Sequence, residues 1–179
     1  MKVIGLSGSP IKDGNTETAI KAVLQGARGR GAEVESIRLY GVEIAPCDAC
    51  DACVAGHGCV IRDGATAILE RLEGAQAVVF GSPVYWFAVS GVLKNLVDRT
   101  YYAAHHKSLA GKRIAVILVQ HSSGAEDALG LFRCWIGEQD CTMLKPVVVN
   151  TAGKPGVVAG DAGLLCRLRE LGEQLVSGS

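Results

Sequence analysis

The chain alternates short aliphatic runs with segments of helical period, and no other pattern in it limits the possible folds as strongly. The candidate strands occupy 3–6, 34–39, 77–80, 114–119 and 146–149. Most of these runs are almost continuously apolar, which is typical of strands buried on both faces. Parallel strands need crossover helices between them. The sequence therefore predicts an α/β fold with three layers, in which helices cover both faces of a five-stranded parallel sheet.

Apolar residues at helical spacing predict which helix faces cover the sheet. The five faces are Ala19, Ile20, Val23, Leu24 and Ala27; Ile68, Leu69 and Leu72; Val92, Leu93, Leu96 and Val97; Leu129, Phe132, Trp135 and Ile136; and Leu164, Leu168, Leu171 and Leu175. Five strands fit the order 2-1-3-4-5, whose ligands lie at the carboxyl ends of the strands. The loops that follow Leu6, Phe80 and Val119 are therefore the candidate binding loops.

Size and charge narrow the function classes. The 179 residues suit one domain, 1–179, with a cysteine-rich insertion at about 46–62. Eighteen basic residues balance eighteen acidic ones, which disfavours a nucleic-acid partner. The longest aliphatic run, 114–119, is too short to span a membrane, and no signal peptide is visible. We therefore expect a cytoplasmic protein that does not associate with membranes.

The loop after the first strand has the composition of an anion site. It runs from Ser7 to Thr16 and leads directly into a helix. Its glycines, hydroxyls and the helix dipole favour a phosphate without formal charge. Its spacing matches neither a P-loop nor a dinucleotide fingerprint. The alternative is a plain connection in which Asn15 caps the helix. The residues we expect to contact the phosphate are Ser7, Ser9, Pro10, Ile11, Asn15 and Thr16.

The loop after the third strand is suited to a planar ring. Residues 85 to 102 hold five of the nine aromatic residues of the chain. The predicted ring contacts are Pro83, Val84, Tyr85 and Trp86, because proline stiffens the turn and an aromatic side chain can cover a flat cofactor. Phe87, Tyr101 and Tyr102 are instead expected in the core or at a subunit interface. Ser122, Ser123 and Gly124 supply a third loop, with a turn and helix cap as the alternative. A phosphate and a flat ring at this edge together indicate FMN.

Four of the seven cysteines, Cys47, Cys50, Cys53 and Cys59, lie within thirteen residues. This spacing favours metal or redox chemistry in a reducing compartment over a disulfide framework. Small residues between them allow the chain to wrap around a [4Fe-4S] cluster, to which Cys59 would supply the fourth thiolate. Structural zinc and a loop without metal remain open.

Other chemically active residues have simpler interpretations. His57 lies inside the cysteine string and is expected in a solvated turn, because four thiolates already complete a metal site. The remaining cysteines, Cys134, Cys141 and Cys166, are expected to be buried small hydrophobes. The segment 105–107 is predicted to be a polar loop, 153–156 a loop before the last helix, and 177–179 a frayed end.

Several motifs resemble those of a known superfamily, the flavodoxin-like NAD(P)H-dependent FMN reductases. Its G-S-P-x-x-x-G-N-T motif is matched from Gly8 to Thr16 and its G-[ST]-P-x-Y motif from Gly81 to Tyr85. Its downstream S-G-x-[LM]-K and D-R motifs are matched by 90–94 and 98–99, so the resemblance covers at least 2–125. The cysteine spacing resembles that of the iron-sulfur flavoproteins, whose compact cysteine string binds a [4Fe-4S] cluster.

The resemblance implies a flavodoxin-like fold, FMN, a cluster beside it, and a homodimer or homotetramer in which the cluster of one subunit approaches the flavin of another. The chain departs from the family pattern at two places. Ile11 stands where many relatives have an arginine near the phosphate, and 62–64 replaces a common acidic pair and methionine. Lys12 or the loop amides would then balance the phosphate charge.

Three functions follow as hypotheses. The first is a flavin-dependent oxidoreductase that carries electrons from reduced ferredoxin or NAD(P)H to a small acceptor such as a quinone or an oxygen species. The second is a cluster-free NAD(P)H-dependent FMN or quinone reductase. The third is an FMN-binding redox sensor whose cluster reports oxygen. In each case the cofactors perform the chemistry, so no acid–base residues are assigned.

Overall fold

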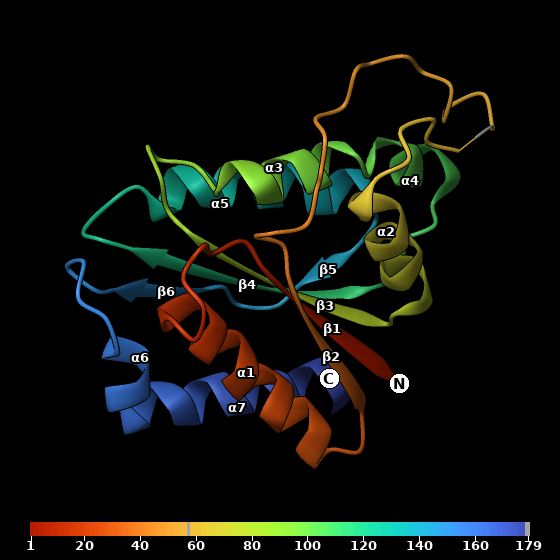
Figure 1. Cartoon of the computed structure of the whole chain (residues 1–179). Coiled ribbons are helices and arrows are strands. Elements are labelled where there is room, and N and C mark those ends of the chain that lie inside the picture. Colours follow the sequence, from red (N-terminus) through yellow and green to blue (C-terminus); the bar gives the residue numbers. More distant parts are fainter. Residues whose placement is uncertain (57, 178–179) are drawn as a thin grey trace.

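A parallel sheet forms the centre of the structure (Figure 1). The computed structural model describes residues 1–56 and 58–177. The sheet has the order β2-β1-β3-β4-β5, and a sixth strand also pairs with β4. The strands are β1 (Lys2–Ser7), β2 (Glu33–Arg38), β3 (Ala77–Pro83), β4 (Arg113–Gln120), β5 (Thr142–Met143) and β6 (Val147–Asn150). The predicted order and the parallel pairing are therefore confirmed.

The predicted fifth strand is divided in two, which corrects the sequence analysis. Met143 pairs with Ile114, whereas Val147 pairs with Ile117, so four steps along this edge oppose three along β4. Pro146, which was expected to begin the strand, lies in this interval. Proline has no N–H to donate to the ladder, so it occurs at edges and bulges. The result is a two-residue β5 and a four-residue β6 along the same edge of β4.

Helices cover the two faces of the sheet as the alternation of strands and helices predicts. They are α1 (Asn15–Gly29), α2 (Gly64–Gly74), α3 (Gly91–Asp98), α4 (Tyr101–His106), α5 (Ala125–Glu138), α6 (Val157–Gly160) and α7 (Ala162–Ser177). Ala77 and Val79 face the core beneath α1 and α7, whereas Val78 and Phe80 face the core beneath α2, α3 and α5 (Figure 1). Successive residues of a strand point to opposite faces, which explains why the inner strands are apolar throughout, whereas the edge strand β2 is not.

Two glycines allow α1 and α7 to approach backbone to backbone. A Cβ atom on Gly26 would lie 1.9 Å from the carbonyl oxygen of Arg169, and one on Gly172 would lie 1.9 Å from that of Val23. Real Cβ atoms do not approach backbone so closely, so any side chain would push the helices apart. The close contact holds α1, which follows the first binding loop, against α7.

Two local predictions were wrong and a third was right. His105 and His106 belong to α4 rather than to a loop, and Lys107 ends that helix in a left-handed conformation. Ser177 is the last residue of α7 rather than part of a frayed end, while 178–179 lie outside the described residues. The loop predicted at 153–156 is present and leads into the short helix α6.

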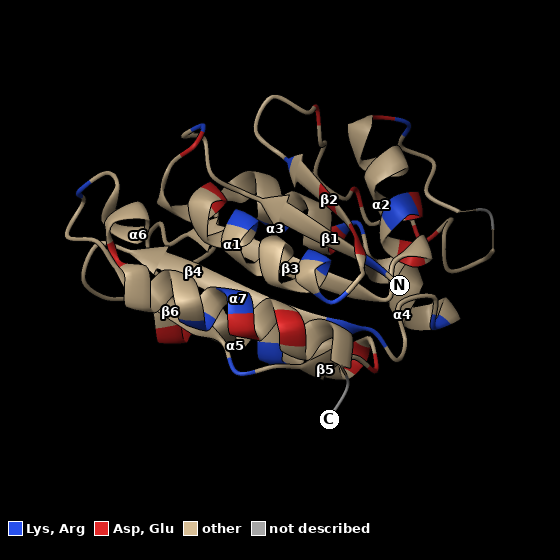
Figure 2. Ribbon diagram, turned by 90° about the horizontal axis from the view of Figure 1, so that it is seen from below, with Lys and Arg blue, Asp and Glu red and all other residues tan. Residues whose placement is uncertain are grey.

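The surface carries both signs of charge. Figure 2 shows Lys and Arg beside Asp and Glu along α7, and one such pair joins Arg30 of the α1 C-cap to Glu173 at 2.7 Å. This mixture accords with the net charge of zero. Within the part of the chain that the structure describes, no helix is long and apolar enough to cross a membrane.

Candidate functional site

A cavity of about 500 Å³ lies at the carboxyl ends of the sheet strands. Four loops line it, which follow β1, β3, β4 and β6. Its lining residues are Ser9, Ile11, Gly14, Asn15, Thr16, Pro83, Val84, Tyr85, Val119, Gln120, His121, Thr151, Gly153, Lys154 and Pro155. Its volume lies in the range of ligand sites for small molecules, and its position is the usual one for a ligand in a doubly wound sheet.

The first loop is organised by its own hydroxyl groups. The Ser7 Oγ accepts a hydrogen bond from the Ser9 N–H at 3.4 Å, and the Ser9 Oγ accepts one from the Ile11 N–H at 3.2 Å. The Gly8 N–H donates to the carbonyl of Gly81 at 2.9 Å, which joins this loop to the end of β3. The side chains of Ser9 and Thr16 are nearly buried at the cavity wall. The loop therefore presents ordered polar groups at the start of α1.

Asn15 joins the first loop to the segment after β6. Its Nδ2 donates to the carbonyl of Lys154 at 2.9 Å, and its Oδ1 accepts from the N–H of Val158 at 3.1 Å. The alternative in which Asn15 caps the helix is wrong, because Asn15 is the first helical residue and the N-cap is Gly14. Asn15 lines the cavity, but both ends of its amide already have protein partners.

The loop after β3 forms a tight aromatic turn. Tyr85 and Ala88 exchange backbone hydrogen bonds of 2.9 and 3.0 Å, and the two residues between them, Trp86 and Phe87, have positive φ angles of 47° and 63°. Such angles are uncommon for aromatic residues and cost free energy, so the neighbouring structure must impose them. Pro83, Val84 and Tyr85 line the cavity. Trp86 points away into solvent, with 94% of its surface exposed.

The aromatic residues that were expected in the core are distributed differently. Phe87 is 56% exposed and Tyr101 is 50% exposed, so the predicted core position is wrong for both residues. Tyr102 is partly buried and packs against the apolar cluster under α2 and α3. The alternative of a subunit interface for these residues stays a prediction.

The loop after β4 contributes its first residues to the cavity. Gln120 and His121 line it, whereas Ser122, Ser123 and Gly124 are not among the lining residues. Gly124 has a φ of +96°, and a Cβ atom there would lie 3.1 Å from the Phe87 ring, so this loop packs against the aromatic turn. The cap of α5 comes from Gln120, whose Oε1 accepts from the Ala125 N–H at 2.8 Å.

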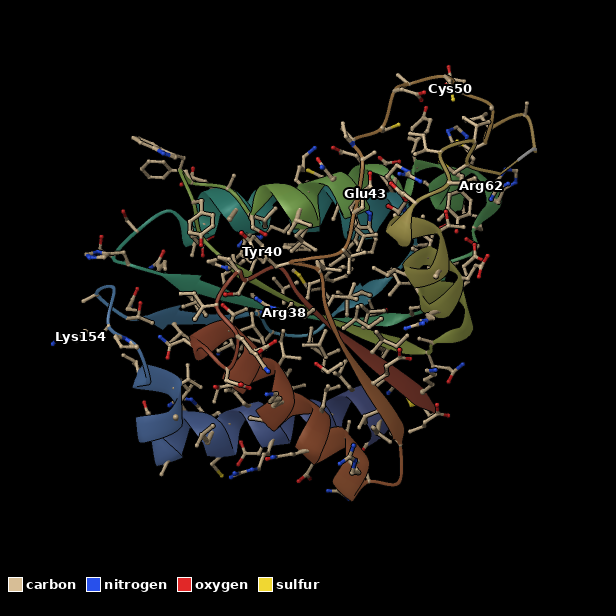
Figure 3. All side chains as sticks on the ribbon, viewed as in Figure 1. Arg38, Tyr40, Glu43, Cys50, Arg62 and Lys154 are labelled. Carbon is tan, nitrogen blue, oxygen red and sulfur yellow. The ribbon has the colours of Figure 1, made fainter. Side chains whose placement is uncertain are left out.

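A fourth loop, which was not predicted from the sequence, also lines the cavity; it comprises Thr151, Gly153, Lys154 and Pro155. Both the N–H and the hydroxyl of Thr151 donate to the carbonyl of Gln120, at 3.0 and 3.2 Å. The signal was available, since the predicted strand order places the end of the last strand beside the end of the fourth. Lys154 is the only Lys or Arg among the described residues that line the cavity, and Figure 3 shows its position at the outer edge.

The residues of the cavity fit a phosphate and a flat ring. Hydroxyls of Ser9 and Thr16 lie beside the first turn of α1, whose backbone N–H groups have no acceptor within the helix. Ile11 is 65% exposed, and Lys12 is exposed and does not line the cavity. Arg38 contacts this loop from β2, because its guanidinium donates to the Pro10 carbonyl (Figure 3). The donor set is therefore mainly uncharged, with apolar walls at Pro83 and Val84.

A second cavity, of about 410 Å³, is lined by residues of the cysteine-rich segment. This segment lies at the far end of α3 (Figure 1). All four thiols of the predicted metal set line the cavity, together with Ile61, Asp98 and Tyr101. Cys47 and Cys50 are exposed, whereas Cys53 and Cys59 are partly buried. A ring nitrogen of His106, Nε2, lies 3.0 Å from the Cys53 carbonyl and connects α4 to the segment. The structure thus gathers the four cysteines around one space.

The thiols share a cavity without closing on a common point. Within residues 1–56 and 58–177, no three His, Cys, Asp or Glu side chains lie close enough together to hold a metal ion. The donor chemistry nevertheless fits a metal centre, because four thiols are the ligand set of a cluster or a structural zinc. Burial raises the pKa of the Cys53 thiol, and the neighbouring Cys59 raises it further. His57 lies outside the described residues.

The remaining cysteines correct the sequence analysis. Cys134 and Cys166 are exposed, and Cys141 is half-buried. Cys134 and Cys166 occupy solvent-facing positions of α5 and α7, between the core positions of each helix. Cysteine packs like a small hydrophobe, but helix periodicity decides which positions face the core.

The sheet order and the cavity at its carboxyl edge define a flavodoxin-like protein. The profile of the NADPH-dependent FMN reductase family matches residues 1–155. An iron-sulfur flavoprotein of Archaeoglobus fulgidus is 31% identical over 169 residues, which cover 91% of this chain and 83% of that protein. The chain therefore belongs to the NADPH-dependent FMN reductase family, and it is a flavin-dependent oxidoreductase.

Other comparisons are more limited in extent. An iron-sulfur flavoprotein of Methanocaldococcus jannaschii is 41% identical over 100 residues, which cover 56% of this chain and 52% of that protein. The chain thus matches only about half the length of this relative. Among solved structures, a flavodoxin from the domain Archaea has a TM-score of 0.65 at 19% identity and covers 98% of this chain and 96% of its own. A flavone reductase has a TM-score of 0.75 at 19% identity, covering 98% of this chain and 62% of its own.

Proposed function

We propose that the protein is an electron-transfer flavoprotein that holds FMN in the cavity at the sheet edge and a [4Fe-4S] cluster on Cys47, Cys50, Cys53 and Cys59. It passes electrons between a donor, reduced ferredoxin or NAD(P)H, and a small acceptor. One observation carries the proposal. A phosphate-and-ring cavity and a cavity lined by four thiols occur in the same chain, at opposite ends of α3. Its seven free thiols suit a reducing cytosol.

The FMN, when bound, supplies the ability to exchange one or two electrons. The chain binds and orients it. Ser9, Thr16 and the first turn of α1 hold the phosphate by hydrogen bonds and by the helix dipole. Pro83, Val84 and Tyr85 form the wall beside the ring and exclude water from one side of it. The hydrogen bond from the Asn15 side chain to the Lys154 carbonyl, which we call the Asn15 tie, holds the fourth loop against the first at the cavity.

The cysteine segment would hold the cluster through its four thiolates. The exposed Cys47 and Cys50 lie on the solvent side, and the partly buried Cys53 and Cys59 lie on the protein side. A cluster bound in this way stays accessible to a protein donor at the surface. Because the thiols do not yet meet at one point, binding would draw the segment inward around the metal.

The separation of the two cavities supports a homo-oligomer. The helix α3 has eight residues and rises about 1.5 Å per residue, so it separates the two ends by about 12 Å. The ring-side turn precedes its first residue, and Asp98, its last residue, lines the thiol cavity. A dimer or tetramer that sets the cysteine segment of one subunit against the flavin cavity of another would shorten the path between the centres.

Metal and flavin analysis of protein purified without oxygen tests the proposal. We expect FMN together with about four irons and four acid-labile sulfides per chain, as one full [4Fe-4S] set requires. Replacing Cys59 by serine should reduce the iron content and leave the FMN content unchanged, whereas Cys134→Ser, an exposed cysteine outside the set, should change neither. Protein that binds no FMN, even after FMN is added, would overturn the proposal.

A second candidate function is a cluster-free NAD(P)H-dependent FMN or quinone reductase. The observation that favours it is the open arrangement of the four thiols. Flavin without iron, combined with steady turnover of NAD(P)H, would establish this function. Zinc in place of iron would indicate that the cysteine segment is structural.

A further inference from the structure

Arg99 is a fully buried cation at the end of α3. Its side chain has 0% exposure. One nitrogen of its guanidinium, Nη1, lies 2.9 Å from the Asp63 Oδ2 and donates to the Ala45 carbonyl at 3.3 Å, while Nη2 donates to the Ile61 carbonyl at 2.9 Å. These three partners flank the cysteine segment on both sides. The planar guanidinium of Arg99 therefore forms hydrogen bonds with the chain just before Cys47 and just after Cys59.

Asp63 also joins the two ends of the cysteine segment, which we call its neck. Its Oδ2 also accepts from the Ala45 N–H at 2.8 Å, although the two residues are eighteen positions apart. Its Oδ1 accepts from the Ala65 N–H at 2.9 Å and so caps α2. Asn95, one turn before Arg99 on α3, adds a bond from its Nδ2 to the Ile44 carbonyl at 3.0 Å. The ends of the cysteine segment are thus fixed to α2 and α3.

One donor of Arg99 has no acceptor in the described part of the chain. Its Nε is buried and makes no hydrogen bond. Buried donors without partners are rare, and each calls for an explanation. Cys59 lies two residues from Ile61, whose carbonyl accepts from the Arg99 Nη2. The guanidinium therefore has both a fixed charge and a free N–H beside the thiol cavity.

We propose that Arg99, oriented by Asp63, is a positioning residue that preforms the four-thiol cavity and stabilises negative charge on its sulfurs. The inference rests on the proposed function, because it assigns a role toward the cluster that this cavity would hold. Hydrogen bonds to the sulfurs and the net charge around a cluster set its reduction potential. A fixed positive charge favours the more negative, reduced form, so Arg99 would shift the midpoint potential upward.

The test compares variants that separate charge from geometry. Arg99→Lys keeps the positive charge but loses the planar guanidinium and the set of hydrogen bonds that it makes. Arg99→Met combined with Asp63→Asn removes the guanidinium and its free N–H together with the partner charge. It therefore strands no buried carboxylate, which would itself destabilise the fold. The matched control is Arg71→Met with Glu35→Gln, which removes a surface pair of 2.8 Å outside the cysteine segment. FMN content and thermal unfolding confirm that each variant folds.

Two measurements report the role, the midpoint potential of the cluster and the rate of iron release to a chelator. The Arg99→Met, Asp63→Asn double variant should have a lower potential and release iron roughly 10- to 100-fold faster, the usual range for partners of metal ligands. Arg99→Lys should retain most of the potential but release iron faster. A purely structural role would accelerate iron release without moving the potential. Unchanged potential and unchanged release in both variants would overturn the inference.

A separate readout distinguishes failure of this inference from failure of the proposed function. If the wild-type protein binds no iron, the cluster part of the proposed function fails. The cavity is then probed in the metal-free protein by the alkylation rates of Cys53 and Cys59, the two partly buried thiols. Faster alkylation in the Arg99 variants than in the control supports a cavity preformed by Arg99, and equal rates refute it. If the double variant fails to fold, Arg99→Lys carries the comparison.

Discussion

Replacing Asn15 by alanine removes the tie between the first and fourth loops of the flavin cavity. The amide makes two hydrogen bonds, to the Lys154 carbonyl at 2.9 Å and from the Val158 N–H at 3.1 Å. At roughly 1 kcal/mol each, their loss should lower the free energy of unfolding by about 2 kcal/mol. For a chain of this size, the melting temperature should fall by about 4–8 °C.

The same substitution should weaken FMN binding indirectly. A released fourth loop must be ordered again when the ligand binds, and a cost of about 1 kcal/mol corresponds to a roughly fivefold higher Kd. Thermal unfolding of the FMN-free protein measures the first effect, and quenching of flavin fluorescence measures the second. Thr18→Ala is the control. Thr18 lies in the first turn of α1, as Asn15 does, but its hydroxyl makes only a 3.4 Å hydrogen bond to the Asp13 carbonyl.

The two measurements decide between two roles for Asn15. The sequence analysis predicts that Asn15 contacts the cofactor, whereas the structure shows an amide whose ends bond to other loops. An unchanged melting temperature together with a Kd raised by more than about tenfold would refute the tie and favour a direct contact with FMN. A lower melting temperature with a modest change in Kd supports the tie.

Other substitutions test the packing and the buried polar groups. Gly172→Ala should destabilise the protein by about 3 kcal/mol or more in denaturant unfolding, because its Cβ would lie 1.9 Å from the Val23 carbonyl oxygen. Burial alone raises the pKa of Asp63, but bonds from the Ala45 N–H and Arg99 outweigh burial and hold that pKa below its ordinary value. Asp63→Asn should therefore cost about 3–5 kcal/mol near pH 7, and this difference should shrink as the pH falls through the lowered pKa, since protonation removes the same charge. Burial, and then the hydrogen bond to Glu73, raises the pKa of Tyr102. The neutral phenol therefore stabilises the fold fully below pH 10, and this contribution is lost as the pH rises further. Tyr102→Phe should remove the last phase of an alkaline absorbance titration.

The fold could be predicted from the sequence because strand burial and helix periodicity are local signals. The run at 114–119 is apolar throughout, and the structure places it in the centre of the sheet as β4. The division of the last strand was less accessible. Pro146 marks it, but only the register of Met143 and Val147 against β4 shows that one residue bulges out. Short helices such as α4, with six residues, give too little periodicity to be recognised.

The parts of the candidate site that lie within one motif of the sequence could be predicted. The parts that several distant loops form together could not. Ser9, Thr16, Pro83 and Tyr85 line the cavity as their motifs predict. Trp86 does not, because two positive φ angles in the turn direct it outward, and no sequence pattern indicates such angles at an aromatic residue. Thr151 and the other members of the fourth loop lie far along the chain from these motifs. They reach the cavity only through the pairing of β6 with β4.

The helix α3 relates the two cavities more directly than the sequence indicates. It begins at Gly91, three residues after the aromatic turn closes at Ala88, and it ends beside Arg99, which holds the neck of the cysteine segment. Helix α3 is packed into the core through Leu93, Leu96 and Val97, so it is a continuous physical connection between its two ends. Closure of the cysteine segment around a metal would therefore bear on the flavin wall at Tyr85 through Arg99 and α3. The helix is about 12 Å long, and the oligomer proposed above would have to shorten the electron path without disturbing that connection.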